Sequence, residues 1–335
     1  MKILAGDIGG THTRLAMAEV AGAEVAILAV ARFENSGRPG PELLIADFLA
    51  RAGPVAACCL AVAGPTDGQT ARFTNLDWQL DAAALSRRFA VPVRLVNDFA
   101  AVGWGLNALH DADLATLQPG QPLLGAPRIA LGAGTGLGVS LCVPGAGLHQ
   151  PLDSEGGHIG FAATDAEQDR LLVFLRAEHG RVSVERLLSG PGLVNLYRFC
   201  RHEAGREASG AVATGVFADA QPARAISRAG LAGADAEAIR ALRLFARIYG
   251  QVAGDLALLA RAEAGVYLAG GIAPQLLELL RNGEFIAGFH AKGRFSPWME
   301  RLPVRVVLDP DVGLKGAALA ATSGLVPGSM PGLMP

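Results

Sequence analysis

Three glycine-rich segments follow short apolar runs in this chain, at residues 6–11, 132–138 and 269–271. Glycine makes up 43 of the 335 residues, about 13%, against an average usage of about 7%. A glycine turn at the end of a strand exposes backbone N–H groups and lets a ligand approach the main chain. The three segments together predict an α/β protein that binds a phosphate-like anion where its strands end.

The composition predicts a globular protein of about two domains, at a prior of about 150 residues per domain. Hydrophobic residues make up 51% of the chain, charged residues 18%, and the net charge is −2. This balance excludes disorder driven by charge and argues against a general nucleic-acid binder. The four cysteines form no CxxC pair, and we expect them to be reduced thiols: Cys58, Cys59, Cys142 and Cys200.

The apolar runs of the sequence predict neither a signal peptide nor a membrane-spanning segment. Asp7 interrupts the N-terminal run before it reaches the length of a signal peptide. Residues 129–148 carry no charge, but repeated glycines and Pro144 indicate a strand, a loop and a second strand. We therefore expect a cytoplasmic protein with no membrane partner.

Alternating apolar runs and amphipathic patterns predict a mixed sheet flanked by helices in the first hundred residues. Strands are expected at residues 2–8, 12–20, 25–33, 56–63 and 91–96, and helices at residues 41–52, 80–90 and 99–109. After a loop at residues 117–126, a strand pair surrounds residues 132–138, and a mostly helical region runs from residue 165 to about 262.

The domain boundaries follow from this pattern. A late strand at residues 304–308 and a helix at 313–321 are expected to rejoin the first domain. The prediction is a small α/β domain of residues 1–109 plus about 304–322, and a large, helix-rich α/β domain of residues 110–303. The proline-containing tail, residues 323–335, is expected to be loose.

The first glycine segment consists of Gly6, Asp7, Ile8, Gly9, Gly10 and Thr11. It lies between two predicted strands and can form a tight turn that binds phosphate. Asp7 can hold a hydrated magnesium ion, and the Thr11 hydroxyl can bond to a phosphate oxygen. An ordinary glycine hairpin is the alternative interpretation.

The second segment places glycine at every other position from Gly132 to Gly138, which leaves one strand face without side chains. The third precedes a helix predicted to start at Pro274, an arrangement that suits the sugar and base of a nucleotide. The alternative interpretation of either segment is close packing of a strand against a helix. Neither of the first two segments is GxGxxG, and no lysine follows a glycine, so the dinucleotide fingerprint and the Walker A loop are both absent from the sequence.

Polar residues follow other strands. Asn97 and Asp98 come just after a predicted strand, where ligands of open α/β sheets bind, and the Asp98 carboxylate could accept a proton from a hydroxyl. The alternative is that Asp98 only caps the next helix. Glu155, His158 and Glu185 add further polar groups in glycine-rich surroundings, although a metal site would need more ligands.

These motifs occur in an order that resembles the bacterial glucokinases of the hexokinase/actin-like ATPase superfamily, nearly end to end. The matching stretches are GDIGGT at 6–11, TNLDW at 74–78, NDFAA at 97–101, GAGTGLG at 132–138, EGGH at 155–158, SVERLLSGPGLVNLYR at 183–198, LAGGI at 268–272 and KGRF at 292–295. The zinc-binding CxCGxxGC run of the related ROK kinases and repressors is absent from the sequence. The segment 204–236 and the tail depart from the family pattern.

The resemblance implies a two-domain α/β fold of the ribonuclease H-like, actin-like ATPase type, with ATP and sugar in an interdomain cleft. It implies that Asp98 is the general base for phosphorylation of glucose at the 6-hydroxyl, with Mg²⁺ held near Asp7 through water. By the same resemblance Asn97, Asp98, Glu155, His158 and Glu185 bind the sugar. Gly6, Asp7, Ile8, Gly9, Gly10, Thr11, Gly134, Thr135, Gly270 and Gly271 would bind the nucleotide. Homodimers are usual in that family.

The sequence leaves other functions open. A kinase for mannose or an amino sugar would use the same scaffold. A non-catalytic sugar sensor would not need Asp98 together with three nucleotide turns. A chaperone or filament ATPase of the superfamily would hydrolyse ATP without a sugar and would not need Glu155, His158 and Glu185.

Overall fold

The computed structural model describes residues 1–73, 76–206 and 211–323, which form two compact units. Unit 1 comprises Met1–Asp113, Ser140–Asp153 and the described residues from Asp309 onward, and unit 2 comprises Leu114–Val139 and Ser154–Leu308. The start of the TNLDW motif, Thr74 and Asn75, and the tail after Ser323 lie outside the described residues. Within the described residues, no helix is both long enough and apolar enough to cross a membrane.

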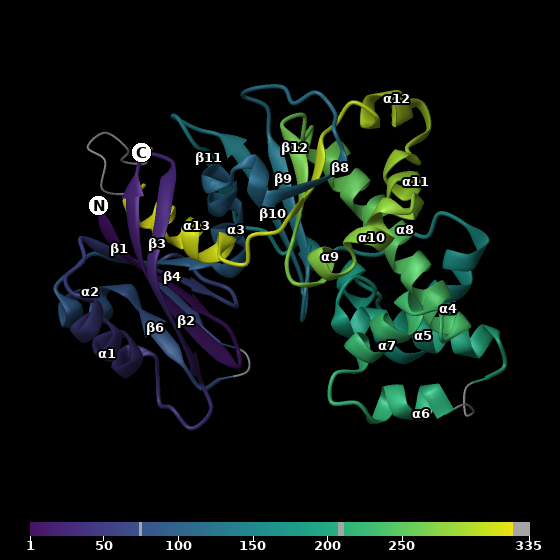
Figure 1. Cartoon of the computed structure of the whole chain (residues 1–335), viewed down its shortest axis with the longest axis horizontal. Helices are drawn as coiled ribbons and strands as arrows, with labels where there is room; N and C mark the ends of the chain where they lie inside the picture. The colour runs from purple at the N-terminus through teal and green to yellow at the C-terminus, as the bar shows by residue number, and fades with distance from the viewer. Residues whose placement is uncertain (74–75, 207–210, 324–335) are drawn as a thin grey trace. The chain divides into compact units, whose positions relative to one another are not determined.

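Unit 1 is built on a five-stranded sheet with the order β3-β2-β1-β4-β7 (Figure 1). Its strands are β1 (Lys2–Ile8), β2 (His12–Ala21), β3 (Glu24–Glu34), β4 (Ala57–Val62) and β7 (Val93–Asn97). The first three form an antiparallel meander, while β1, β4 and β7 run parallel. All five strands expected from the apolar runs are confirmed. A short hairpin of β5 (Thr70–Arg72) and β6 (Gln79–Asp81) was not expected, since each strand has only three residues.

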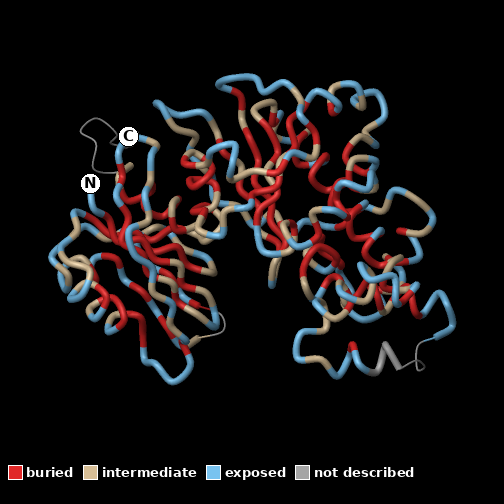
Figure 2. The backbone as a smooth tube through the Cα atoms, in the orientation of Figure 1, coloured by how far each residue is buried: buried red, intermediate tan, exposed pale blue. Residues whose placement is uncertain are grey.

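Helices bury both faces of this sheet. Helices α3 (Asp98–Gly105) and α13 (Val312–Thr322) contribute to the core on one face, and α1 (Glu42–Ala52) and α2 (Ala82–Phe89) to the core on the other. Glycine allows α3 and α13 to pack closely, because a Cβ on Gly316 would lie 1.7 Å from the Ala101 carbonyl oxygen. The 3-10 turns η1 (Leu106–Ala108) and η2 (Asp111–Asp113) follow α3. The buried central strands appear red in Figure 2.

The second sheet has six strands in the order β11-β10-β9-β12-β13-β8. They are β8 (Leu114–Gln118), β9 (Arg128–Ala133), β10 (Leu137–Pro144), β11 (His149–Leu152), β12 (Gly265–Ala269) and β13 (Val304–Val307). The strand expected at 304–308 exists, but it pairs with β12 and β8 and so belongs to unit 2, whereas α13 belongs to unit 1. Strand β8 also occupies part of the segment expected to be a loop. Local pattern cannot reveal either pairing, because both partners are distant in sequence.

The predicted large domain of residues 110–303 is wrong at one more place, because Ser140–Asp153, with β11 and the end of β10, belongs to unit 1. Apart from its strands, unit 2 is mostly helical, as expected. Its helices are α4 (Ala166–His179), α5 (Gly190–Glu203), α6 (Ala211–Ala218), α7 (Pro222–Leu231), α8 (Ala236–Ala260), α9 (Ile272–Gln275), α10 (Leu277–Arg281), α11 (Glu284–His290) and α12 (Ser296–Met299), with 3-10 turns η3 (Gly156–His158), η4 (Val184–Arg186) and η5 (Gly293–Phe295). The helix expected from Pro274 begins two residues earlier, at Ile272.

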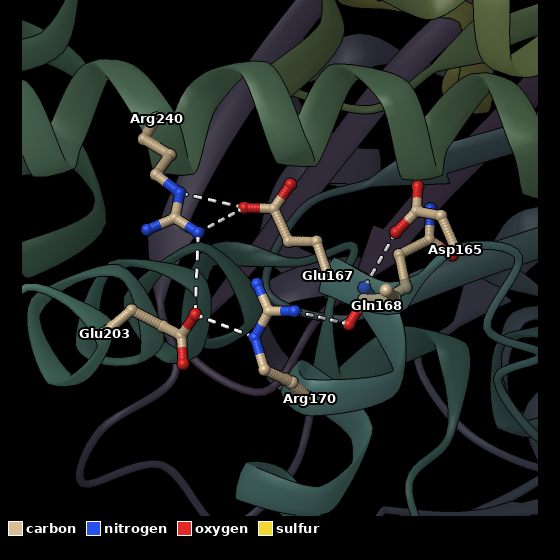
Figure 3. Close-up of polar contacts among 7 residues, drawn as sticks. Asp165, Glu167, Gln168, Arg170, Glu203 and Arg240 are labelled. Atoms are coloured by element: carbon tan, nitrogen blue, oxygen red, sulfur yellow. Dashed lines mark hydrogen bonds and ion pairs between the residues drawn. The ribbon is translucent and has the colours of Figure 1, made fainter.

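Three of these helices are joined by an ion-pair network (Figure 3). Arg240 of α8 donates to Glu167 of α4 at 2.8 Å from Nε, and Arg170 of α4 donates to Glu203 of α5 at 2.9 Å. Each pair is partly exposed and contributes on the order of 0–1 kcal/mol, so the network adds little to the stability of the unit. Helix α5 supplies part of the site in unit 2.

Candidate active site

In unit 1, the candidate residues gather at the carboxyl ends of three parallel strands. The register pairs Ile8 of β1 with Val62 of β4, and Val62 with Asn97 of β7. Asp7, the turn that follows Ile8, and Asn97 therefore lie at one edge of the sheet. The Asn97 side-chain amide donates to the Gly64 carbonyl at 3.4 Å, across the same edge. Ligands of α/β sheets bind at such an edge.

The first glycine segment forms a turn between β1 and β2. Gly9 N–H donates to the His12 carbonyl at 3.0 Å, which closes the turn, and Gly10 and Thr11 are exposed. Gly6 and Ile8 lie in β1 itself, where Ile8 is in the apolar core and a Cβ on Gly6 would lie 2.5 Å from Leu60. The exposed part of the segment is therefore the turn, and Gly6 and Ile8 pack it against the sheet.

Asn35 is a residue of this region that the sequence did not single out. Its side chain is 1% exposed and donates to the Gly9 carbonyl at 2.8 Å. It also accepts from the buried Thr13 hydroxyl at 2.8 Å. A lone asparagine after an edge strand carries no sequence signal, so this contact could only be found in the structure.

Asp7 carries a charge that its surroundings only partly compensate. Burial raises the pKa of Asp7, and the guanidinium of Arg14, opposite it in β2, opposes that shift. Arg14 itself is paired with Asp311 and donates to the Pro310 carbonyl at 3.0 Å. A desolvated carboxylate of this kind fits a cation. No cluster of three or more metal-binding side chains occurs in the described part of the chain, so Asp7 would have to share a cation with water or a ligand.

Asn97, and not Asp98, caps helix α3. The extended backbone of Asn97 directs its side-chain oxygen to the N–H groups of Phe99 and Ala100, at 2.9 and 3.2 Å. The alternative in which Asp98 is merely the cap is therefore wrong. Asp98 is the first helical residue, partly buried, and accepts from Phe99 N–H at 2.8 Å. The cap and the helix N-terminus place this carboxylate at the edge of the sheet described above.

In unit 2, the second and third glycine segments meet. Gly134 N–H donates to the Gly136 carbonyl, and the Gly134 carbonyl accepts from Gly190 N–H, both at 2.8 Å. Gly270, with a φ of 78°, approaches so closely that a Cβ there would lie 2.7 Å from the Ala133 carbonyl oxygen. By contrast, a Cβ on Gly134 or Gly271 would meet nothing within 4 Å. Gly270 is thus needed for packing, while Gly134 and Gly271 face open space.

That open space is a cavity of about 670 Å³ within unit 2. Besides Gly134, Thr135 and Gly271, it is lined by the N-terminal end of α5 and by α7 and α9. Its walls are largely apolar or amide-bearing, and Arg224 is the charged residue among them. The volume is in the range of small-molecule and cofactor sites. Three of the four unit 2 residues predicted to bind the nucleotide therefore line one cavity, and Gly270 packs behind it.

The remaining candidates lie on two neighbouring 3-10 turns of unit 2. A bond of 3.0 Å from Val184 N–H to the Ile159 carbonyl ties the segments of η3 and η4 together. Glu155 and His158 are exposed, with 3.8 Å between the His158 Nε2 and the Glu155 Oε2. Glu185 is partly buried and accepts from Leu137 N–H at 2.9 Å, next to the second glycine segment. The structure thus brings these three polar residues into one region of unit 2.

Comparison with known proteins agrees with these features. The family model described as "Glucokinase" matches residues 4–324. A glucokinase of Trichormus variabilis is 40% identical over 337 aligned residues, which cover 95% of this chain and 98% of that one. The chain belongs to the glucokinase family. The predicted family is therefore confirmed, and with it an enzyme of the kinase class.

Solved structures of glucokinases share the fold. The crystal structure of glucokinase from an Antarctic psychrotroph superimposes with a TM-score of 0.84 at 30% identity, covering 96% of this chain and 98% of that one. A ROK-family glucokinase from Streptomyces griseus, solved with glucose and AMPPNP, has a TM-score of 0.64 at 22% identity, with 96% and 99% coverage. The expected α/β fold of the actin-like ATPase type is confirmed.

Proposed function

We propose that this chain transfers the γ-phosphoryl group of ATP to the 6-hydroxyl of glucose, with Asp98 as the general base. The observation that carries the proposal is the position of Asp98. It lies partly buried at the N-terminus of α3, at the same sheet edge as Asp7 and the glycine turn. Membership of the glucokinase family supports the substrate and the reaction.

In this mechanism Asp98 removes the proton from the 6-hydroxyl as its oxygen attacks the γ-phosphorus. The bond from that phosphorus to the bridging oxygen of ADP breaks, and the proton stays on the Asp98 carboxyl. General bases contribute about 10²–10⁴-fold to rate. The Asn97 side chain accepts from two N–H groups of the first turn of α3, so the capping of this helix does not rest on the Asp98 carboxylate alone.

The nucleotide is assigned to two places. The backbone amides of the exposed residues Gly10 and Thr11 would donate to phosphate oxygens, since turns of this type bind anions. The cavity lined by Gly134, Thr135 and Gly271 would take the nucleoside. The ROK-family relative solved with AMPPNP supports ATP as the donor.

Asp7 is the residue assigned to Mg²⁺, through water. The raised pKa of its desolvated carboxyl is the observation that fits a cation there. The ion would neutralise charge on the phosphates during transfer. Asp7 itself would orient the ion's water ligands, and the turn amides would hold the phosphate oxygens in place.

Sugar specificity is assigned to Asn97 and Asp98 in unit 1 and to Glu155, His158 and Glu185 in unit 2. Carboxylates and an imidazole that hydrogen-bond to substrate hydroxyls discriminate strongly against sugars that lack those hydroxyls. Mannose or an amino sugar as the preferred substrate is the alternative within the same reaction class.

The test is ADP release from Mg-ATP with glucose, mannose, fructose, N-acetylglucosamine or no sugar. We expect glucose to give the highest turnover. We expect Asp98→Asn to lower kcat by about 10³-fold, within the range for loss of a general base, while glucose still binds by calorimetry. Sugar-independent ATP hydrolysis would exclude the proposed sugar residues. Sugar binding without turnover in the unmodified protein would instead indicate a sensor.

A further inference from the structure

The turn that follows β1 is held by the buried residue Asn35, which directly follows β3. Three of its groups contact the turn region. The side-chain nitrogen donates to the Gly9 carbonyl at 2.8 Å, the backbone N–H donates to the Thr11 carbonyl at 2.9 Å, and the side-chain oxygen accepts from Thr13. Asn35 thus acts on both sides of Gly10.

The chemistry of its partners determines the orientation of the Asn35 amide. A carbonyl oxygen can only accept, so the NH₂ group must face Gly9. The oxygen then faces the Thr13 hydroxyl, which donates to it at 2.8 Å. Asn35 and Thr13 are 1% and 0% exposed, so water cannot substitute for either bond. The buried pair therefore holds one orientation of the amide.

This orientation determines where the Gly10 N–H points. In a trans peptide, the carbonyl of one residue and the N–H of the next point in opposite directions. Since the Gly9 carbonyl points to Asn35, the Gly10 N–H points away from it, on the exposed side of the turn. Neither the Gly10 nor the Thr11 amide donates to another group in the described part of the chain.

We infer that Asn35 is a positioning residue for phosphoryl transfer: its buried amide holds the Gly9–Gly10 peptide so that the Gly10 N–H is presented to the phosphates of the nucleotide. The inference rests on the proposed function of the turn. Asn35 touches neither substrate and acts only through the peptide that it orients. Its loss should therefore affect the nucleotide and the transfer step, and leave sugar binding unchanged.

The test compares Asn35→Ala with Asn107→Ala, a control in the same unit. Asn107 also bonds to backbone, donating to the Trp104 and His149 carbonyls at 2.9 Å each, but it holds a different loop. For Asn35→Ala we expect kcat/KM for Mg-ATP to fall by about tenfold, through a higher KM and a lower kcat, which is the size of one well-placed hydrogen bond. The Kd for glucose should change by less than about twofold. Asn107→Ala should lower Tm without changing either kinetic constant.

A second variant, Asn35→Asp, keeps the size of the side chain and its acceptor for Thr13. Its carboxylate cannot donate to the Gly9 carbonyl, so it should be at least as defective toward Mg-ATP as Asn35→Ala. If both Asn35 variants keep the KM and kcat of the unmodified protein and lose only Tm, Asn35 is a structural residue and the inference is overturned.

The proposed function and this inference fail in different ways. If the unmodified protein releases no ADP with any sugar, the proposed function fails. Calorimetry with Mg-ATP alone then tests Asn35: weaker binding in Asn35→Ala supports the inference, and unchanged binding overturns it. If the unmodified protein phosphorylates glucose and Asn35→Ala does so equally well, only the inference fails.

Discussion

The turn after β1 in unit 1 and the paired glycine segments of unit 2 have similar compositions but are held in place differently. In unit 1, hydrogen bonds from Asn35 hold the turn, and a Cβ on Gly9 would lie 3.4 Å from its nearest neighbour, the His12 carbonyl oxygen. In unit 2, backbone packs on backbone, and a Cβ on Gly270 would lie 2.7 Å from the Ala133 carbonyl oxygen. Gly9 therefore lies in a turn with room for a Cβ, whereas Gly270 is required for close packing.

The two regions also differ in charge. Asp7 lies beside the turn of unit 1, and Asp98 lies at the same sheet edge. The cavity of unit 2 has no carboxylate among its lining residues in the described part of the chain. In the proposed function, the general base and Mg²⁺ therefore belong to unit 1, and the nucleoside belongs to unit 2.

The largest effect should come from Gly270→Ala. Alanine at a φ of 78° is strained, and its Cβ would overlap a backbone oxygen that cannot rotate away. We expect the free energy of unfolding to fall by about 2–4 kcal/mol, measured by urea denaturation. Gly9→Ala, the corresponding change in unit 1, should lower it by less than about 1 kcal/mol. If both variants lose the same free energy of unfolding, the two regions do not differ in how closely their glycines are packed.

A smaller effect should follow from Gly271→Val, which fills the cavity without straining the fold. Gly271 has an ordinary helical backbone, with φ −77° and ψ −16°, and no neighbour within 4 Å of the Cβ position. We expect the KM for ATP to rise by about tenfold or more and the Tm to stay within about 2 °C of the unmodified protein.

Gly313→Val is the matched control for that variant. Gly313 is also near the start of a helix and also has no neighbour within 4 Å of its Cβ position, but it lies in α13 of unit 1. Its KM for ATP should be unchanged. If Gly271→Val keeps the KM for ATP of the unmodified protein, the nucleoside does not bind in this cavity.

The smallest effect concerns Asp7→Asn and depends on pH. Because burial holds the pKa of Asp7 above its usual value of 3.8, the unfolded carboxyl loses its proton more readily than the folded one. Ionisation of Asp7 therefore favours unfolding as the pH rises through 3.8, and this cost is complete above the raised pKa. Asp7→Asn should be more stable than the unmodified protein at pH 7, and the difference should disappear as the pH falls below 3.8.

Urea denaturation at several pH values without Mg²⁺ measures this difference, and the exposed Asp47, changed to Asn, controls for the loss of a charge. The same Asp7 variant should need more Mg²⁺ for half-maximal turnover. A gain in stability without any change in the Mg²⁺ requirement would show that Asp7 is desolvated for another reason.

Much of unit 1 could be predicted from its apolar runs. Strands β1 to β4 and β7 lie where the pattern predicted them. A strand that is buried on one or both faces has an alternating or continuous run of apolar residues, which can be seen in the local sequence. The short strands β5, β6 and β11 have no such apolar run. For the site, the glycine segments and the polar residues at strand ends were found in advance. The roles of Asn97 and Asp98 at the start of α3 were not separable, since either residue type can cap a helix.

The sequence by itself determined the five strands of the first sheet, the positions of the glycine turns and the family, because apolar periodicity and motif order are local properties of the chain. Only the tertiary structure decided that β13 joins the second sheet, that Gly270 packs while Gly271 faces a cavity, and that Asn35 bonds to the Gly9 carbonyl. These outcomes depend on which distant segments become neighbours. Strand order and close packing determine which segments become neighbours, and the local spacing of residues does not encode this.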